Sequence, residues 1–211
     1  MNSPAAPNGP GRPKDLAKRQ AILDSAKTLF MRHGYDGSSM DAIAAEAAVS
    51  KLTVYSHFTD KETLFCAAVK AKCAEQLPEL LFELPEDAPI ERVLCNIAHS
   101  FHGLINSRES IELHRVMVAM ATQNPTLSQL FFEAGPQRLL NEMERLLKQA
   151  DQAGKLRIDN PRSAAEHFFS LIKGGQHFRL LIGCAAPLTG AAAHEHVRDV
   201  VALFLRAYAP D

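Results

Sequence analysis

The sequence predicts an all-α protein, in which an N-terminal three-helix head with a helix-turn-helix precedes a larger helical body. Apolar residues recur every three or four positions along most of the 211 residues, which is the spacing of one helix face. No stretch shows the alternation of apolar and polar residues that is typical of a strand. Asparagine-proline pairs and glycines interrupt the apolar stretches at positions where helices begin and end.

The head is expected to span residues 14–61 and to begin with a helix from Asp15 to about His33. Residues 1–13 are rich in proline and glycine, so we expect a disordered tail there. Gly34 suits the left-handed cap that ends many helices. The apolar stripe of this first helix consists of Ala21, Ile22, Ser25, Ala26, Leu29 and Phe30.

Two short helices joined by a tight turn are expected within residues 40–58. The first spans residues 40–47, and Ser38 or Ser39 is its N-cap. Asp41 falls in its first turn, where a negative charge suits the positive end of the helix dipole. The small residues of this helix allow a second helix to cross it closely.

The second short helix, residues 51–58, has a polar outer face that suits nucleic acid. Ser50 can cap it, and Val54 and Phe58 lie one turn apart and point to the core. No carboxylate occurs between residues 49 and 59. Such a helix can enter a major groove, with its N-terminal residues at base edges and its flanks on phosphates. Its outer face presents Lys51, Thr53, Tyr55, Ser56 and His57.

A fourth helix is expected to start at the Thr-Asp-Lys-Glu motif of residues 59–62, which reads as a capping box. Pro78 should end or kink this helix, because proline lacks the backbone N–H that a helix interior uses. The acidic, proline-rich residues 85–89 then mark a boundary, and the regulatory and dimerisation body is assigned to residues 62–211.

The body reads as helices throughout. Asn124-Pro125 and Asn160-Pro161 each place an N-cap residue before a first-turn proline, and Gly154 marks a helix end. The expected helices are Ile90–Asn106, Glu109–Thr122, one from Asn124-Pro125 to about Ala153, Arg162–Gly183, and Ala191–Tyr208.

A set of short motifs in the head is more specific than a generic helix-turn-helix pattern. They are Gly34-Tyr35, Ser39-Met40, Ile43-Ala44, Ala47-Ala48-Val49-Ser50-Lys51, Val54-Tyr55, His57-Phe58, Lys61-Glu62 and Leu64-Phe65. Together they closely resemble the TetR family of transcriptional regulators. Two positions depart from the family pattern: Ala48 stands where glycine is common, and Leu52 stands where a small residue is frequent.

The resemblance implies that double-stranded operator DNA is a partner, with Tyr55, His57 and Lys61 on the phosphate backbone. Leu52 near the start of the reading helix favours a thymine methyl group over a polar base edge. In the tail, Arg12 could enter a minor groove, as flexible basic arms do; a solvated tail is the alternative. The expected DNA-binding residues are Ser39, Met40, Ser50, Lys51, Leu52, Thr53, Tyr55, Ser56, His57 and Lys61.

In the body, residues 124–147 and 154–208 look similar to the AefR-like subgroup of the same family. The resemblance implies a homodimer that forms through the last two helices and a small-molecule effector that binds between the body helices. The apolar residues expected at the dimer interface are Leu171, Phe178, Leu181, Val197, Val201, Phe204 and Leu205. The expected ligand-binding residues are His99, His102, Arg115, Met120, His167, Lys173 and His177, and ordinary surface or core positions are the alternative for each histidine.

Composition supports this reading and argues against others. The chain has a net charge of −1, and residues 1–61 hold 8 Lys or Arg against 6 Asp or Glu, so charge favours DNA binding only weakly. No nucleophile motif and no Glu-x-x-His pair for a di-iron site occurs. His99 and His102 share a helix face, but no third metal ligand is identifiable. We therefore expect neither an enzyme nor a metal or other cofactor.

No apolar run approaches the ~18–20 residues that span a bilayer, and the N-terminus has no apolar signal core. The four cysteines form no CxxC pair and read as reduced thiols. We expect a cytoplasmic, homodimeric, DNA-binding repressor whose operator affinity is controlled by a small molecule. The alternative is control by a protein partner or by redox state.

Overall fold

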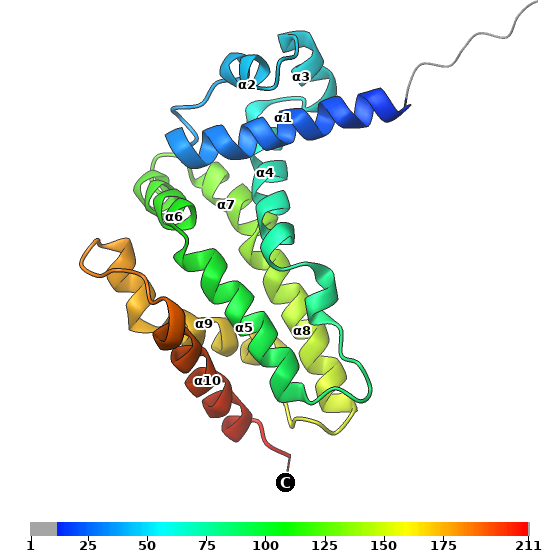
Figure 1. Ribbon diagram of the computed structural model, residues 1–211, viewed down its shortest axis with the longest axis vertical. Coiled ribbons are helices and arrows are strands. Elements are labelled where there is room, and N and C mark those ends of the chain that lie inside the picture. Colours follow the sequence, from blue (N-terminus) through cyan, green and yellow to red (C-terminus); the bar gives the residue numbers. More distant parts are fainter. Residues whose placement is uncertain (1–11, 211) are drawn as a thin grey trace, which may run out of the picture. The chain divides into compact units, whose positions relative to one another are not determined.

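The computed structural model describes residues 12–210, with the side chains of residues 16–210, and this part of the chain is helical without a strand. It divides into two compact units that meet within one helix, between Ala68 and Val69. Figure 1 shows the helices of each unit. The expectations for the tail up to residue 11 and for the side chain of Arg12 lie outside the described residues. No described helix is long and apolar enough to cross a membrane.

The head consists of α1 (Arg12–His33), α2 (Met40–Glu46), α3 (Lys51–His57) and the first part of α4 (Lys61–Gln76). α1 begins three residues before the expected start, and it ends as predicted at Gly34, whose φ is 71°. α2 and α3 each end one residue earlier than the sequence indicated. The three-helix head with a helix-turn-helix is therefore confirmed.

Three aromatic rings form the centre of the head core. The ring of Phe65 lies edge-on to those of Phe30 and Tyr35, with 5.2 Å between ring centroids in both pairs. Such edge-to-face pairs stabilise a core beyond the area that they bury. Other side chains that are fully buried in the head are Ile22, Ala26, Ile43, Val54 and Leu64.

The predicted capping box at the start of α4 is wrong by one residue. The helix begins at Lys61, and the carboxylate of Asp60, not the hydroxyl of Thr59, accepts a 2.7 Å hydrogen bond from the backbone N–H of Thr63. This bond lowers the pKa of Asp60. An aspartate is as good an N-cap as threonine and adds a negative charge at the positive helix end, so it prevails.

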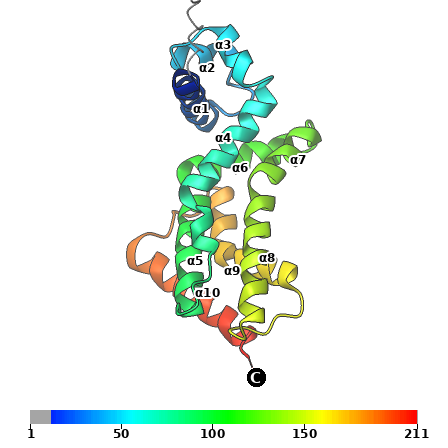
Figure 2. The same ribbon diagram turned by 90° about the vertical axis from the view of Figure 1, so that its right-hand side faces the viewer.

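The body is built around α5 (Ile90–Asn106), whose bounds agree with the prediction. α5 packs against α6, α9, α10 and the short 3₁₀ helix η1, and α9 packs against both α5 and α8 (Figure 2). The fully buried side chains of this core include Phe82, Leu94, Ile97, Phe168 and Phe204. The remaining elements are η1 (Glu79–Phe82), α6 (Arg108–Met120), α7 (Pro125–Ala134), α8 (Pro136–Gln152), α9 (Pro161–Leu181) and α10 (Gly190–Ala207).

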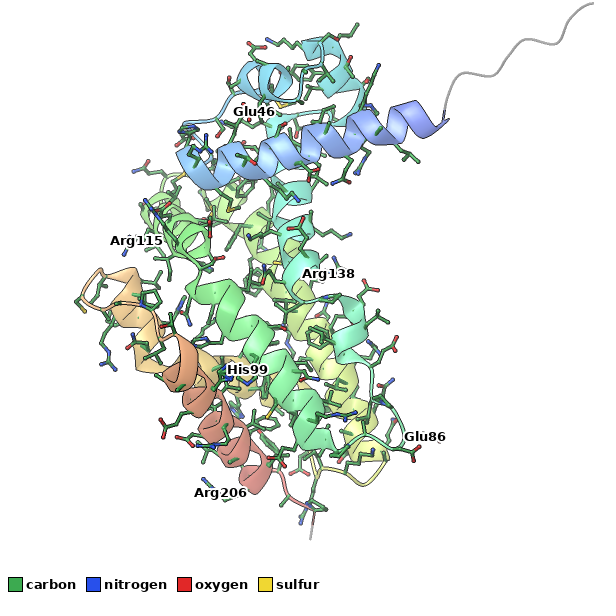
Figure 3. All side chains as sticks on the ribbon, in the orientation of Figure 1. Glu46, Glu86, His99, Arg115, Arg138 and Arg206 are labelled. Atoms are coloured by element: carbon green, nitrogen blue, oxygen red, sulfur yellow. The ribbon has the colours of Figure 1, made fainter. Side chains whose placement is uncertain are left out.

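The segment between α4 and α5 belongs to the body. α4 ends at Gln76, just before Pro78, as the sequence predicted. Arg138 of α8, labelled in Figure 3, forms an ion pair with Glu79. The ammonium of Lys155 donates to the backbone carbonyls of Glu86 at 2.7 Å and Ala88 at 3.0 Å. These contacts attach residues 79–88 to the second half of the chain.

The long helix expected from Asn124-Pro125 to about Ala153 is two helices, α7 and α8. Gly135, with φ −120° and ψ −82°, separates them, and Pro136 opens α8. Proline disfavours helical backbone at the residue before it and lacks the N–H for a continuous helix. A Cβ at Gly135 would also lie only 3.2 Å from Val69 Cγ1 and 3.3 Å from Cys73 Sγ. The break therefore lets α4 approach closely.

The asparagine-proline signals act as predicted. The Asn124 side chain accepts a 3.0 Å hydrogen bond from the N–H of Leu127, and Asn160 accepts one of the same length from Ser163. Each asparagine satisfies a backbone donor that has no partner within its helix.

α9 is interrupted at Gly174, where φ is 51° and ψ is −168°. Only glycine adopts this backbone conformation readily. A Cβ at this position would lie 3.6 Å from His196 Cε1, which is an ordinary contact. The glycine is therefore required by the backbone geometry and not by lack of space.

Candidate nucleic-acid interface

The two helices of the helix-turn-helix are each capped by the serine that precedes them. Ser39 Oγ accepts a 3.1 Å hydrogen bond from the N–H of Ala42. Ser50 Oγ accepts one of 3.1 Å from the N–H of Thr53. Ser38, the other cap candidate of α2, is buried and donates to the carbonyl of Gly34. These bonds fix where both helices begin, and thus which residues α3 presents first.

The turn between α2 and α3 needs a left-handed residue, and Ala48 supplies it with a φ of 51°. The N–H of Ala48 donates to the carbonyl of Ala45, and that of Val49 donates to Ala44 at 3.0 Å. These two bonds close α2 as many helix ends are closed. An alanine in this conformation costs about 1 kcal/mol relative to glycine.

α3 is anchored to the head by its inner face. Val54 is fully buried, and Phe58, the residue after the helix, is 2% exposed. The guanidinium of Arg19 lies 4.9 Å from the centroid of the Phe58 ring, within the range of a cation–π contact. The opposite face of α3 is thereby held away from the head core.

The outer face of α3 is open to solvent. Leu52 is 80% exposed and Tyr55 is 43% exposed. Thr53 and His57 are half-buried, and the Thr53 hydroxyl lies 2.8 Å from Ser50 Oγ, within the cap. The other exposed residues of this surface are Ser39, Ser50, Lys51 and Ser56. The exposed polar face therefore matches the surface that the sequence analysis assigned to DNA.

Two residues that the sequence analysis assigned to DNA binding, Met40 and Lys61, are less accessible than the exposed face of α3. Met40 is 7% exposed, because it begins the inner face of α2 and packs in the head core, so its side chain is unavailable to a groove. The Lys61 ammonium lies 4.1 Å from the centroid of the Tyr35 ring. Burial lowers the pKa of Lys61 and raises that of Tyr35 to about 12. Lys61 is therefore held in place by a ring.

An ion pair joins α2 to the start of α3. Lys51 Nζ lies 2.8 Å and 3.0 Å from the two carboxylate oxygens of Asp41. The hydrogen bond to Asp41 raises the pKa of Lys51, and both side chains remain largely exposed. A charge pair in solvent is worth little to stability. Its main effect is to hold Lys51, and a carboxylate beside it, at the base-reading end of α3.

Replacing Asp41 with Asn is expected to raise affinity for any duplex about three- to tenfold, because Lys51 is released and a charge that repels phosphate is removed. Gel-shift titrations over a range of salt should show a steeper dependence on salt. Glu46→Gln, at a position on α2 that Figure 3 labels, is the matched control, since it removes the same charge without touching Lys51. An equal gain in both variants would show that only net charge matters.

The expected ligand-binding residues of the body fall into two groups. His102 and His177 are buried, His99 and Met120 are half-buried, and Lys173 neighbours His177 electrostatically. The structure adds His114, Asn106, His194 and His196 to this region, because the rings of His99 and His194, His102 and His196, and His114 and His177 lie in pairs. The sequence did not assign these four to the ligand site, because α6 and α10 are brought to α5 only by the tertiary fold; His194 and His196 were interpreted as solvated residues.

The other two expected ligand residues have structural partners. His167 Nδ1 lies 2.8 Å from the hydroxyl of Tyr208. Arg115, labelled on α6 in Figure 3, donates to the carbonyls of Leu181 at 2.8 Å and Leu180 at 2.7 Å. The last carbonyls of a helix have no partner within it, so Arg115 closes the end of α9.

Changing Arg115 to Met should therefore lower the free energy of unfolding by about 1–2 kcal/mol, because two charge-assisted hydrogen bonds at a partly exposed site are lost. Urea denaturation measures this change. Arg206→Met, which removes an exposed arginine of α10, should cost less than about 0.5 kcal/mol. Equal costs in the two variants would contradict the capping role of Arg115.

The residues expected at the dimer interface differ in how far the single chain buries them. Val197, Val201 and Phe204 are buried in the core of the single chain, because they face α5 and α9; the expectation that they face a second copy is wrong for this fold. Phe178 is 63% exposed. Leu171, Leu181 and Leu205 are half-buried, and Ile182 and Leu203 are further exposed apolar residues of the same two-helix region.

Two of the four thiols, Cys73 and Cys95, have raised pKa values. Burial raises the pKa of Cys73 to about 11 and also raises that of Cys95. A thiol with a raised pKa is mostly protonated at neutral pH and is a poor nucleophile. Cys184 is exposed. These two half-buried thiols do not favour control by redox state.

The fold and the outer face of α3 define a class of protein: a helix-turn-helix regulator that binds DNA. Residues 22–68 match the family of bacterial regulatory proteins called tetR, and residues 92–210 match the C-terminal domain of AefR-like transcriptional repressors. The chain belongs to the TetR family of transcriptional regulators, with an AefR-like body. It is a regulator and not an enzyme.

Proteins with similar sequences or structures match this chain over nearly its whole length. The HTH-type transcriptional regulator YdeS of Bacillus subtilis is 28% identical over 195 residues, which cover 90% of this chain and 89% of YdeS. A TetR-family regulator from Mesorhizobium loti has a solved structure with 29% identity and a TM-score of 0.79, covering 94% of this chain and 99% of that one. The flavonoid-responsive regulator FrrA is 29% identical with a TM-score of 0.69, covering 90% and 96% of the two chains.

Proposed function

We propose that this protein is a homodimeric repressor whose affinity for operator DNA is controlled by a small molecule bound in the helical body. The observation that carries the DNA-binding part is the outer face of α3, on which Lys51, Leu52 and Tyr55 are exposed while Val54 is fully buried. The proposed DNA contacts are Ser39, Ser50, Lys51, Leu52, Thr53, Tyr55, Ser56, His57 and Lys61.

Within that surface the residues have different tasks. Lys51 and Leu52 lie in the first turn of α3, which is the part of a recognition helix that reaches base edges. Leu52 offers only an apolar surface, so it favours a thymine methyl group. Tyr55, His57 and Lys61 follow at the far end of α3 and at the start of α4, where they would contact phosphates and fix the register.

A homodimer is proposed because one operator half-site gives one head too little affinity. Two reading helices must lie about one DNA turn, ~34–36 Å, apart. Phe178 of α9, Ile182 directly after it and Leu203 of α10 are large apolar side chains that the single chain leaves exposed. Large exposed apolar side chains on the two helices that the resemblance assigns to the dimer support a partner-binding surface there.

Control by a ligand follows the logic of population shift. A small molecule that binds better to one body conformation favours it, and the heads then match the half-site spacing less well. The flavonoid-responsive regulator FrrA is a similar protein whose name describes such a response. For strong release of DNA the ligand must prefer the second state by several kcal/mol.

The test is footprinting on DNA that flanks the gene, followed by gel shifts with and without a panel of small hydrophobic and amphipathic compounds. We expect a protected site of two half-sites one helical turn apart, and at least one compound that releases it. Absence of any protected palindrome in flanking and selected random DNA would contradict operator binding. A symmetric operator that only a protein partner or an oxidant releases would favour the alternative mode of control.

A further inference from the structure

Four basic side chains gather in the body, and we call them the basic cluster: His102 of α5, His114 of α6, and Lys173 and His177 of α9. The rings of His114 and His177 meet edge-to-face with 5.7 Å between their centroids. Lys173 acts electrostatically on both of these histidines, and His102 acts on His177. The cluster thus joins three helices that are far apart in the sequence.

The members of the cluster oppose one another's positive charge. Burial lowers the pKa of His177 to about 4, and repulsion from His114, Lys173 and His102 adds to this effect. Burial first, and then Lys173, lowers the pKa of His114. Partial desolvation lowers the pKa of Lys173 as well, although the residue as a whole is exposed. A group of like charges that is partly removed from water is unfavourable unless an opposite charge is present.

No such opposite charge comes from the described part of the chain. Within residues 16–210, none of the four side chains forms an ion pair with a carboxylate. His177 Nδ1 lies 3.0 Å from the amide oxygen of Asn106, a neutral partner. His114 Nδ1 is buried and has no hydrogen bond of standard geometry, although a backbone contact with Ser110 acts on the ring and raises the pKa of His114. Buried polar nitrogens are normally well hydrogen-bonded, so the ring can accept a better partner.

The described surroundings of the cluster include neutral polar, basic and apolar groups, and Asn106 and Ser110 are the neutral polar ones. Phe131 of α7 packs edge-on against His114, with ring centroids 5.7 Å apart. The guanidinium of Arg115 is already bound to the carbonyls at the end of α9. The other titratable side chains coupled to the cluster are His99 on α5 and His194 and His196 on α10.

We propose that the basic cluster binds the carboxylate of an organic acid whose remaining part is apolar. Lys173 supplies the positive charge, His114 and His177 supply N–H donors, and Phe131 supplies apolar surface. This inference rests on the proposed function, because it names the chemical class of the effector in the body. A metal ion is a poorer occupant, since no group of three metal-binding side chains converges among the described residues.

The occupant determines the direction of the pH dependence. A bound carboxylate favours the charged forms of the histidines, so their pKa values rise and the protein takes up protons on binding. Affinity for the carboxylate should therefore increase as the pH falls below the raised pKa of the bound histidines, and it should level off near 4, the pKa of His177 in the free protein. A neutral ligand has no such effect.

The experiment compares matched probes on the full chain: hexanoate, octanoate and decanoate against hexanol, octanol and decanol. We expect the carboxylates, and not the alcohols, to raise Tm. Calorimetry in two buffers of different ionisation enthalpy should show proton uptake. Alcohols that stabilise the protein equally, carboxylates without effect, or binding without proton uptake would each overturn the proposal.

Two variants locate the site. Lys173→Met and His177→Asn should each weaken carboxylate binding at least about tenfold. Lys173→Met should leave the Tm of the unliganded protein unchanged or raised, because it removes repulsion, which separates lost binding from lost folding. Lys148→Met is the control: it removes an exposed lysine of α8 that pairs with Glu144, and it should bind like the parent. Full carboxylate binding by Lys173→Met would overturn the proposal.

Gel shifts separate this inference from the proposed function. A neutral compound that releases operator DNA would overturn the carboxylate site but leave control by a ligand intact. Carboxylates that bind through Lys173 and leave operator affinity unchanged would support the site and contradict its role in control.

Discussion

Changing Phe178 to Asp is expected to convert the protein to a monomer and to weaken operator binding at least about 100-fold. Phe178 is the most exposed aromatic residue of α9, and a carboxylate there would be buried without a partner in the proposed interface. Two linked heads bind two half-sites with an avidity of about 10²–10⁴ over a single head. Sedimentation velocity and gel shifts on the same samples measure both effects.

Leu80→Asp is the matched control for this variant. Leu80 of η1 is 74% exposed, lies outside α9 and α10, and should tolerate the charge in a dimer with parental affinity. A Phe178→Asp protein that remains a dimer at micromolar concentration would place the interface elsewhere. A monomer that still binds the operator with parental affinity would contradict the need for two heads.

Replacing Tyr55 with Phe is expected to weaken operator binding about 100-fold in the dimer. The variant keeps the ring and removes only the hydroxyl, and a hydrogen bond to a charged phosphate is worth about 1.5 kcal/mol, or roughly tenfold, in each of two heads. The loss should be similar for specific and unrelated DNA, because phosphates carry no sequence information. Fluorescence anisotropy with both duplexes measures it.

The dependence on salt distinguishes Tyr55 from a charged contact. A hydroxyl releases no counterion, so Tyr55→Phe should leave the salt slope unchanged, whereas Lys61→Gln should flatten it by about two units per dimer if each lysine neutralises a phosphate. Parental affinity in Tyr55→Phe would remove Tyr55 from the interface. A changed base preference in that variant would instead assign Tyr55 to reading bases.

Local sequence signals were sufficient to predict a helix boundary where a cap residue or a continuous apolar stripe sets it. The bounds of α5 follow from a continuous apolar stripe, and the starts of α7 and α9 follow from asparagine caps before proline. The break before Pro136 was missed because the apolar stripe continues across Gly135 and outweighed the local signal of a glycine before a proline. The close approach of Val69 and Cys73 that this glycine permits is a tertiary contact, which the sequence alone does not reveal.

The outer face of α3 was predictable because a helix with buried Val54 and Phe58 must expose its opposite side. Met40 was misassigned because a residue that belongs to a family motif can serve the core. In the body, Val197 was assigned to a dimer interface because a sequence does not say which apolar face is covered by the same chain. The capping contacts of Arg115 could not be predicted, since its carbonyl partners lie 65 and 66 residues away in the sequence.

The interruption at Gly174 divides α9 into two helical segments joined by one residue with non-helical backbone. The first segment is anchored in the core by the buried side chains of Phe168 and Ile172. The second carries Phe178 and is tied to α6 by Arg115 and to α5 by the bond between His177 and Asn106. Because continuous helical geometry ends at Gly174, a displacement of α6 would be passed through Arg115 to the segment that carries Phe178 more directly than to the segment that holds Phe168.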